Sequence, residues 1–190
     1  MRLSGGEARG RRLRRPRSSA IRPTSDRVRE ALFDILGRRV HGSAFLDAFA
    51  GTGAVGLEAL SRGAARAVFL ERDRSALAII RENLALGPWG GSARVLAGDV
   101  LTSLRRLATE RERFSIAFLD PPYDDRLGHA LLASVALLVE PGGVVIAERR
   151  TSDSTVEAPP DAFRRGRAYR YGDTSLTVLH RLPGGAGERA

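Results

Sequence analysis

The 190-residue chain contains no cysteine, which removes disulfides, thiolate metal sites and every mechanism that needs a cysteine nucleophile. It has no apolar run long enough to cross a bilayer, and its arginine-rich start lacks the apolar core of a secretory signal. Only three histidines are present, and their scattered spacing is unlike that of metal ligands. We therefore expect a cytoplasmic protein that binds no metal.

Lysine is absent too: the 31 basic residues are all arginines, and the formal net charge is +9. Residues 1–22 hold eight arginines and one acid, a surplus of +7, which leaves 23 arginines against 21 acids, or +2, for the rest. Such a cluster attracts phosphate backbones, although a solvated tail that binds nothing would have the same composition. The candidate contacts to such a nucleic-acid backbone are Arg11, Arg12, Arg22 and Arg27.

This basic extension, residues 1–22, has too few apolar residues to build a core of its own. We expect either a disordered tail or a small two-stranded ribbon that turns between Gly5 and Gly10. A helix should follow, starting at Pro23-Thr24-Ser25-Asp26, where hydroxyl and carboxylate groups can cap free N–H groups. Its predicted apolar face contains Val28, Ala31, Leu32 and Ile35, with Arg27 and Arg29 on the polar side.

From residue 43 onward, apolar runs alternate with amphipathic ones, a pattern typical of an α/β fold in which helices cover both faces of a mostly parallel sheet. The predicted strands are 44–48, 65–71, 93–98, 114–120 and 143–148, and the predicted helices lie near 54–62, 74–86, 100–109 and 126–138.

The end of the chain predicts a hairpin, with strands at 164–171 and 175–181 that turn at Gly172-Asp173. We expect one domain over residues 23–182, a loose tail over 183–190, and a monomer. Trp89 is assigned to a surface loop.

A glycine-rich stretch, Asp47-Ala48-Phe49-Ala50-Gly51-Thr52-Gly53-Ala54-Val55-Gly56, joins the first predicted strand to the next helix. Its glycines allow close backbone approach to a ligand, and the following helix presents unpaired N–H groups. Gly51 to Gly56 matches the dinucleotide fingerprint GxGxxG, with Glu71 near the distance of a ribose-binding acid. The pattern alone fits NAD, a flavin or S-adenosylmethionine, or a turn that only packs a helix on a sheet.

Each predicted parallel strand is followed or ended by a carboxylate: Asp47, Glu71, Asp99, Asp120 and Glu148. The carboxyl ends of strands line the ligand crevice of an open α/β sheet, so these acids are expected around one pocket. Such a pocket disfavours an anionic pyrophosphate and favours a cationic ligand rich in donors. S-adenosylmethionine, with its sulfonium, ammonium and amino groups, fits that requirement better than NAD.

The stretch Asp120-Pro121-Pro122-Tyr123 directly follows the apolar strand that ends at Leu119. The prolines fix the backbone and cannot donate N–H, so this turn offers carbonyls and one carboxylate as acceptors for an NH2 group. Tyr123 can stack on the base that carries this group. The absence of cysteine agrees with methylation of an amino group, because methylation of pyrimidine carbon usually uses a thiolate.

These motifs resemble class I, Rossmann-like S-adenosylmethionine-dependent methyltransferases. More specifically, the stretches Arg22–Phe33, Asp47–Gly53 and Leu57–Ala64 are similar to the RsmD family of bacterial 16S ribosomal RNA guanine-N2 methyltransferases. The resemblance covers nearly the whole chain. It departs at Ser4-Gly5, where family members tend to have apolar residues.

The resemblance implies a seven-stranded sheet with an antiparallel last strand, and 16S ribosomal RNA, within an assembling or assembled 30S subunit, as the substrate. It implies that the loop with Asp47, Phe49, Gly51, Thr52 and Gly53 holds the methionine part of S-adenosyl-L-methionine. Glu71, grouped with Arg72, would hold the ribose, and Asp99 with Val100 the adenine. The catalytic group would be Asp120, Pro121, Pro122 and Tyr123.

Three alternatives remain open at this point. An adenine-N6 methyltransferase acting on DNA would use the same Asp-Pro-Pro-Tyr motif. An NAD-binding oxidoreductase would use the same glycine pattern. A non-catalytic RNA-binding module would need only the basic extension.

Overall fold

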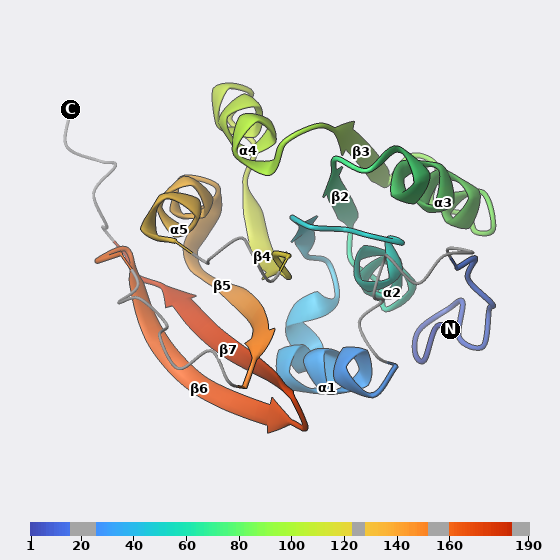
Figure 1. Ribbon diagram of the computed structural model, residues 1–190, viewed down its shortest axis with the longest axis horizontal. Helices are drawn as coiled ribbons and strands as arrows, with labels where there is room; N and C mark the ends of the chain where they lie inside the picture. The colour runs from blue at the N-terminus through green and yellow to red at the C-terminus, as the bar shows by residue number, and fades with distance from the viewer. Residues whose placement is uncertain (16–25, 123–127, 152–159, 184–190) are drawn as a thin grey trace. The chain divides into compact units, whose positions relative to one another are not determined.

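The computed structural model describes residues 1–15, 26–122, 128–151 and 160–183. Seven strands form one mixed sheet in the order β3-β2-β1-β4-β5-β7-β6 (Figure 1). The chain divides into two compact units, Met1–Val100 and Leu101–Ala190. We describe them one at a time.

The first unit contains the first three strands of the sheet in chain order. Its elements are α1 (Asp26–Leu36), the 3-10 helix η1 (Gly37–Val40), β1 (Ala44–Asp47), α2 (Ala54–Ser61), β2 (Arg66–Glu71), α3 (Arg74–Leu84) and β3 (Ala93–Ala97). Both β1 and β3 pair parallel with β2. Helix α2 packs on β1 and β2, and α3 packs on β3. Parallel strands are covered on both faces, so β1 and β2 are apolar without alternation. Their side chains Phe45 and Phe69 are fully buried.

The second unit carries the rest of the sheet. Its elements are α4 (Val100–Thr109), which begins at the boundary, β4 (Phe114–Leu119), α5 (His129–Ala136), β5 (Val139–Arg150), β6 (Phe163–Tyr171) and β7 (Thr174–Arg181). Strands β4 and β5 pair parallel, whereas β7 is antiparallel to both β5 and β6. The predicted terminal hairpin and antiparallel last strand are confirmed, and so is the α/β fold class.

Three expectations about local structure are wrong. Trp89 is buried, with 5% of its surface exposed, and the backbone of Gly87 lies so close to its ring that a Cβ there would sit 2.6 Å from it. Arg29 is fully buried instead of lying on the polar side of α1. Strand β5 extends to Arg150, so Glu148 lies inside the strand and not at its end.

No helix within the described ranges is long and apolar enough to span a membrane.

Candidate functional site

The glycine loop between β1 and α2 is a tight turn closed by a hydrogen bond from Gly53 N to Ala50 O at 2.7 Å. Gly51 and Gly53 adopt φ values of +54° and +77°, which side chains rarely tolerate. The Asp47 carboxylate, 1% exposed, accepts from Gly56 N at 2.9 Å. It therefore binds one of the unpaired N–H groups in the first turn of α2 and holds the loop against the helix.

The third glycine of the pattern, Gly56, brings α2 close to the sheet. A Cβ at this position would lie 2.3 Å from Cε1 of Phe69 on β2. Only glycine fits this approach without a shift of that ring, which is the packing role that the third glycine of this fingerprint has in Rossmann-like folds.

Glu71, the last residue of β2, binds the glycine loop directly. Its Oε2 accepts from Gly51 N at 2.7 Å, and its Oε1 accepts from the backbone N of Arg72 and of Asp73, both at 2.8 Å. A carboxylate has about four acceptor positions, so these three bonds leave capacity for one more donor. The structure thus brings the predicted ribose acid and the predicted methionine loop together.

The predicted adenine-binding pair lies just after β3. Gly98 N donates to Glu71 O at 2.9 Å, which ties this turn to the end of β2. Asp99 is exposed, and Val100, half-buried, is the first residue of α4. Of the other predicted cofactor residues, Thr52 is buried, Phe49 is half-buried and Arg72 is exposed.

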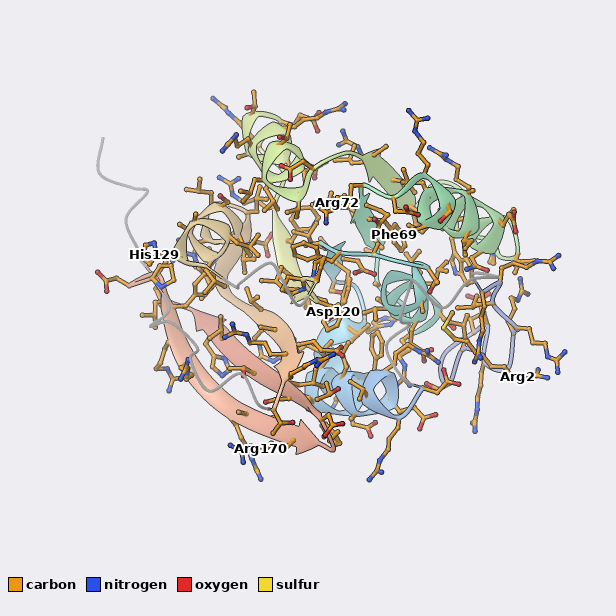
Figure 2. The ribbon with its side chains drawn as sticks, viewed as in Figure 1. Arg2, Phe69, Arg72, Asp120, His129 and Arg170 are labelled. Carbon is orange, nitrogen blue, oxygen red and sulfur yellow. The ribbon has the colours of Figure 1, made fainter. Side chains whose placement is uncertain are left out.

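The predicted catalytic turn belongs to the second unit. Asp120 directly follows β4 (Figure 2). It is half-buried, as is Pro121, whereas Pro122 is exposed. Tyr123 lies outside the described residues. The expectation that the acids of both units share one pocket stays a prediction.

The N-terminal segment, residues 1–15, folds back on itself through an antiparallel bridge between Arg2 and Arg12. Leu3, Ala8 and Leu13 are buried, so the segment contributes to the core of the first unit although it is too polar to form its own. Arg11 and Arg12 of this segment are exposed.

The remaining two predicted RNA contacts have different positions. Arg27, near the start of α1, is exposed, and Arg22 lies outside the described residues.

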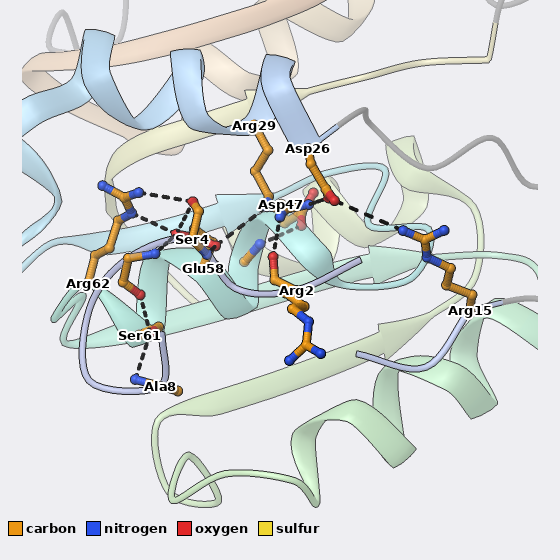
Figure 3. A network of polar contacts seen from close by, with 12 residues as sticks. Arg2, Ser4, Ala8, Arg15, Asp26, Arg29, Asp47, Glu58, Ser61 and Arg62 are labelled. Atoms are coloured by element: carbon orange, nitrogen blue, oxygen red, sulfur yellow. Dashed lines mark hydrogen bonds and ion pairs between the residues drawn. The ribbon is translucent and has the colours of Figure 1, made fainter. Parts of the chain in front are cut away.

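A fully buried carboxylate, Glu58 of α2, holds the N-terminal segment in place (Figure 3). Its oxygens accept from Ser4 N and Ser4 Oγ, both at 2.9 Å, from Gly5 N at 2.7 Å and from Arg62 Nε at 2.8 Å. Ser4-Gly5 departs from the apolar pattern of the resemblance, and these are the residues that bind Glu58. One helical turn on, Ser61 Oγ donates to Gly5 O and accepts from Ala8 N.

Arg29 of α1 completes this network. Its Nη1 lies 2.9 Å from Asp26 Oδ1, its Nε lies 3.4 Å from Glu58 Oε2, and its Nη2 donates to Arg2 O at 2.5 Å. The guanidinium has no exposed surface. Asp26 and Glu58 lie within ion-pair distance of it, but among the described residues only Nη2 has a hydrogen-bond partner, whereas Nε and Nη1 have none.

Among the buried polar residues that sequence reasoning missed are Arg29, Glu58 and Asn83, although each stands in an apolar pattern. Arg29 precedes Phe33 and Leu36 by four and seven residues, which puts it on their face of the helix. Glu58 is the one charged residue in the eight-residue helix α2, and it lies between Leu57 and Ala59. Asn83 follows Ile80 by three residues on the buried face of α3.

Comparisons with known proteins show where the chain belongs. A family model described as conserved hypothetical protein 95 matches residues 1–180. The chain belongs to this family. It is 35% identical over 182 residues to YlbH of Bacillus subtilis (strain 168), covering 94% of this chain and 97% of YlbH.

A second relative of this chain is ribosomal RNA small subunit methyltransferase D of Escherichia coli (strain K12). The two are 44% identical over 123 residues, a stretch that covers 65% of this chain and 60% of the relative. Among solved structures, the yhhF protein of Escherichia coli matches with a TM-score of 0.82 and 30% identity, covering 96% of this chain and 98% of that one. The predicted resemblance to the RsmD family is confirmed, and the fold is that of class I methyltransferases.

Proposed function

We propose that this protein methylates the exocyclic N2 amino group of a guanine in 16S ribosomal RNA. The observation that carries the proposal is family membership, since one relative is named ribosomal RNA small subunit methyltransferase D. The contact between Glu71 and the glycine loop agrees with it. The predicted cofactor, S-adenosyl-L-methionine, is confirmed by the methyltransferase family and fold.

In this proposal the glycine loop, Glu71 and Asp99 hold the cofactor. The loop supplies backbone groups to the methionine part, and the remaining acceptor position of Glu71 receives a ribose hydroxyl. The exposed carboxylate of Asp99, next to Val100, accepts from the adenine amino group in this proposal.

The turn Asp120-Pro121 has a separate role, since the guanine amino nitrogen is a weak nucleophile whose lone pair is delocalised into the ring. Acceptance of its two hydrogens by the Asp120 carboxylate and the Pro121 carbonyl directs that lone pair toward the methyl carbon. The new N–C bond forms as the S–C bond breaks, and the pair of that bond returns to sulfur. The methylated nitrogen then loses a proton to Asp120 or to water. Catalysis consists of placement and electrostatic stabilisation.

For this reaction the guanine must leave its stack, because its amino group cannot reach such a turn from inside a helix. Tyr123 is the proposed platform for the extruded ring.

The test is methylation of naked 16S RNA, 30S particles and duplex DNA by the purified protein, with nucleosides identified by mass spectrometry. N2-methylguanosine in 16S RNA is the expected product, whereas N6-methyladenine in DNA would overturn the proposal. Asp120→Asn should lower the rate by on the order of 100-fold and leave binding of S-adenosylhomocysteine unchanged. Asp173→Asn, at the exposed hairpin turn, is the control and should keep full activity.

A further inference from the structure

Asn83, near the end of α3, connects two parts of the first unit that are distant in sequence. Its side chain is fully buried. Nδ2 donates to Thr52 O of the glycine loop at 3.0 Å and to Arg14 O at 3.4 Å, while Oδ1 accepts from Arg14 N at 2.6 Å. One amide therefore touches both the predicted cofactor loop and the basic N-terminal segment.

These partners fix the orientation of the amide. A backbone N–H can bond only to its oxygen, and a carbonyl can bond only to its NH2 group. Asparagine is thus suited to this position, since aspartate could not donate to Thr52 O and alanine could bind neither partner.

The segment is also attached to the helix that starts at the loop. Glu7 N donates to Ser61 O at 2.7 Å, and Glu58 and Ser61 of α2 bind Ser4, Gly5 and Ala8. Since α2 begins directly after Gly53, the segment contacts both the first helix after the loop and, through Asn83, the loop itself.

We propose that Asn83 is a positioning residue that couples RNA binding by the N-terminal segment to cofactor binding by the glycine loop. This inference rests on the proposed function for the identity of the two ligands. RNA phosphates that engage the exposed arginines of the segment hold the Arg14 backbone, which holds the Asn83 amide and so the Thr52 carbonyl. Cofactor binding at Gly51 to Gly53 has the same effect in the opposite direction. Such coupling is reciprocal, and each ligand raises the affinity for the other by the same factor.

The experiment measures the affinity of a naked 16S RNA transcript for the full chain, with and without saturating S-adenosylhomocysteine. In the wild-type protein the cofactor product should raise the RNA affinity by about fivefold or more, the lower end of measured couplings. In Asn83→Ala and Asn83→Asp this ratio should fall to about one, while each ligand still binds alone.

Glu82→Ala is the matched control on the same helix. Glu82 Oε2 lies 4.0 Å from Nε of the same Arg14, but both side chains are largely exposed. Its loss should leave the ratio at the wild-type value, because the Arg14 backbone stays bonded to Asn83.

A second pair of variants tests the contact from the segment side, in case substitution of the buried amide prevents folding. Arg14→Pro removes the backbone N–H that donates a hydrogen bond to Asn83 Oδ1, whereas Arg14→Ala removes the guanidinium and keeps that N–H. In Arg14→Pro the ratio of the RNA affinities with and without S-adenosylhomocysteine should fall to about one, whereas in Arg14→Ala it should stay at the wild-type value.

A ratio of one in the wild-type protein would overturn the inference, and so would a wild-type ratio in either Asn83 variant. Neither result affects the proposed function, which is judged by methylation of RNA by the wild-type protein. Absence of that methylation would overturn the proposed function instead.

Discussion

At the scale of single residues, the two buried charges Glu58 and Arg29 of the first unit are compensated to different degrees, since Nε and Nη1 of Arg29 have ion-pair contacts but no hydrogen-bond partner among the described residues. Glu58 receives four hydrogen-bond donors, which matches the capacity of about four acceptor positions on a carboxylate. Arg29 is placed between Glu58 and Asp26. Because a buried ion is costly once its partner is removed, the loss of one member should weaken the whole network.

Glu58→Gln tests this expectation. It keeps the size of the side chain and removes the charge opposite Arg29 and Arg62, so we expect the free energy of unfolding to fall by about 3 kcal/mol or more. Denaturant unfolding measures it. The control is Glu110→Gln, which alters another Arg–Glu pair four residues apart at 2.9 Å, but on a surface where the arginine side chain is 62% exposed. That change should cost about 0.5 kcal/mol or less, and equal losses in both variants would contradict the interpretation.

At the scale of elements, the contact between α2 and β2 depends on the absence of a side chain at Gly56. Gly56→Ala should destabilise the fold by about 1–3 kcal/mol through displacement of the buried Phe69 ring, although alanine favours helix. Gly91→Ala is the control, since nothing lies within 4 Å of a Cβ there. Thermal and denaturant unfolding of both variants check the prediction, and an undiminished stability of Gly56→Ala would refute it.

The start of α3 has its own stabilising group, the side chain of Asp73, which accepts from Ala76 N. The hydroxyl of Ser75, followed by the Ala76 N–H, holds the pKa of Asp73 below its ordinary value. A carboxyl whose pKa is lower in the folded state stabilises the protein above its unfolded pKa, and that contribution is lost as the pH falls through the folded value.

Asp73→Ala should therefore cost about 1 kcal/mol at neutral pH, and the difference from wild type should shrink in acid. Urea unfolding at neutral pH and near pH 3 measures both values, with Asp34→Ala on the exposed side of α1 as the control. A difference that stays constant or grows toward acid would show that the carboxylate does not cap the helix.

The elements themselves were largely predictable from periodicity. All predicted strands and helices of the α/β core are present, with ends that differ by a few residues. The largest difference is the start of β5 at Val139 instead of residue 143. Residues 126–127 of the helix predicted near 126–138 lie outside the described residues. Burial was harder to predict, because the tertiary partners of a residue are not local. Arg29 is buried beside Arg2 and Glu58, which are distant in sequence, so the polar pattern of its own helix misplaced it. The loop composition around Trp89 likewise did not indicate that its ring is buried.

At the scale of the whole molecule, the excess positive charge lies in residues 1–22, whereas the predicted cofactor and catalytic residues lie from Asp47 onward. The cofactor loop was predictable because its glycine spacing is tied to backbone geometry, and the structure joins Glu71 to Gly51 within it. The attachment of the basic segment to this unit was not predictable, since it depends on Glu58, Ser61 and Asn83 in two helices. The segment thus presents its arginines from a fixed base.

This arrangement predicts where RNA attraction originates. Arg11→Gln/Arg12→Gln should reduce the salt slope of RNA binding by about 1.4–1.8, since each phosphate contact contributes roughly 0.7 for single strands and 0.9 for duplexes. The control Arg164→Gln/Arg167→Gln removes two exposed charges from β6 and should leave the slope nearly unchanged. Filter binding of 16S RNA over a range of salt concentrations measures both. If the two double variants lower the slope equally, the attraction follows net charge and not the N-terminal segment, and the proposed RNA contacts at Arg11 and Arg12 would have to be abandoned.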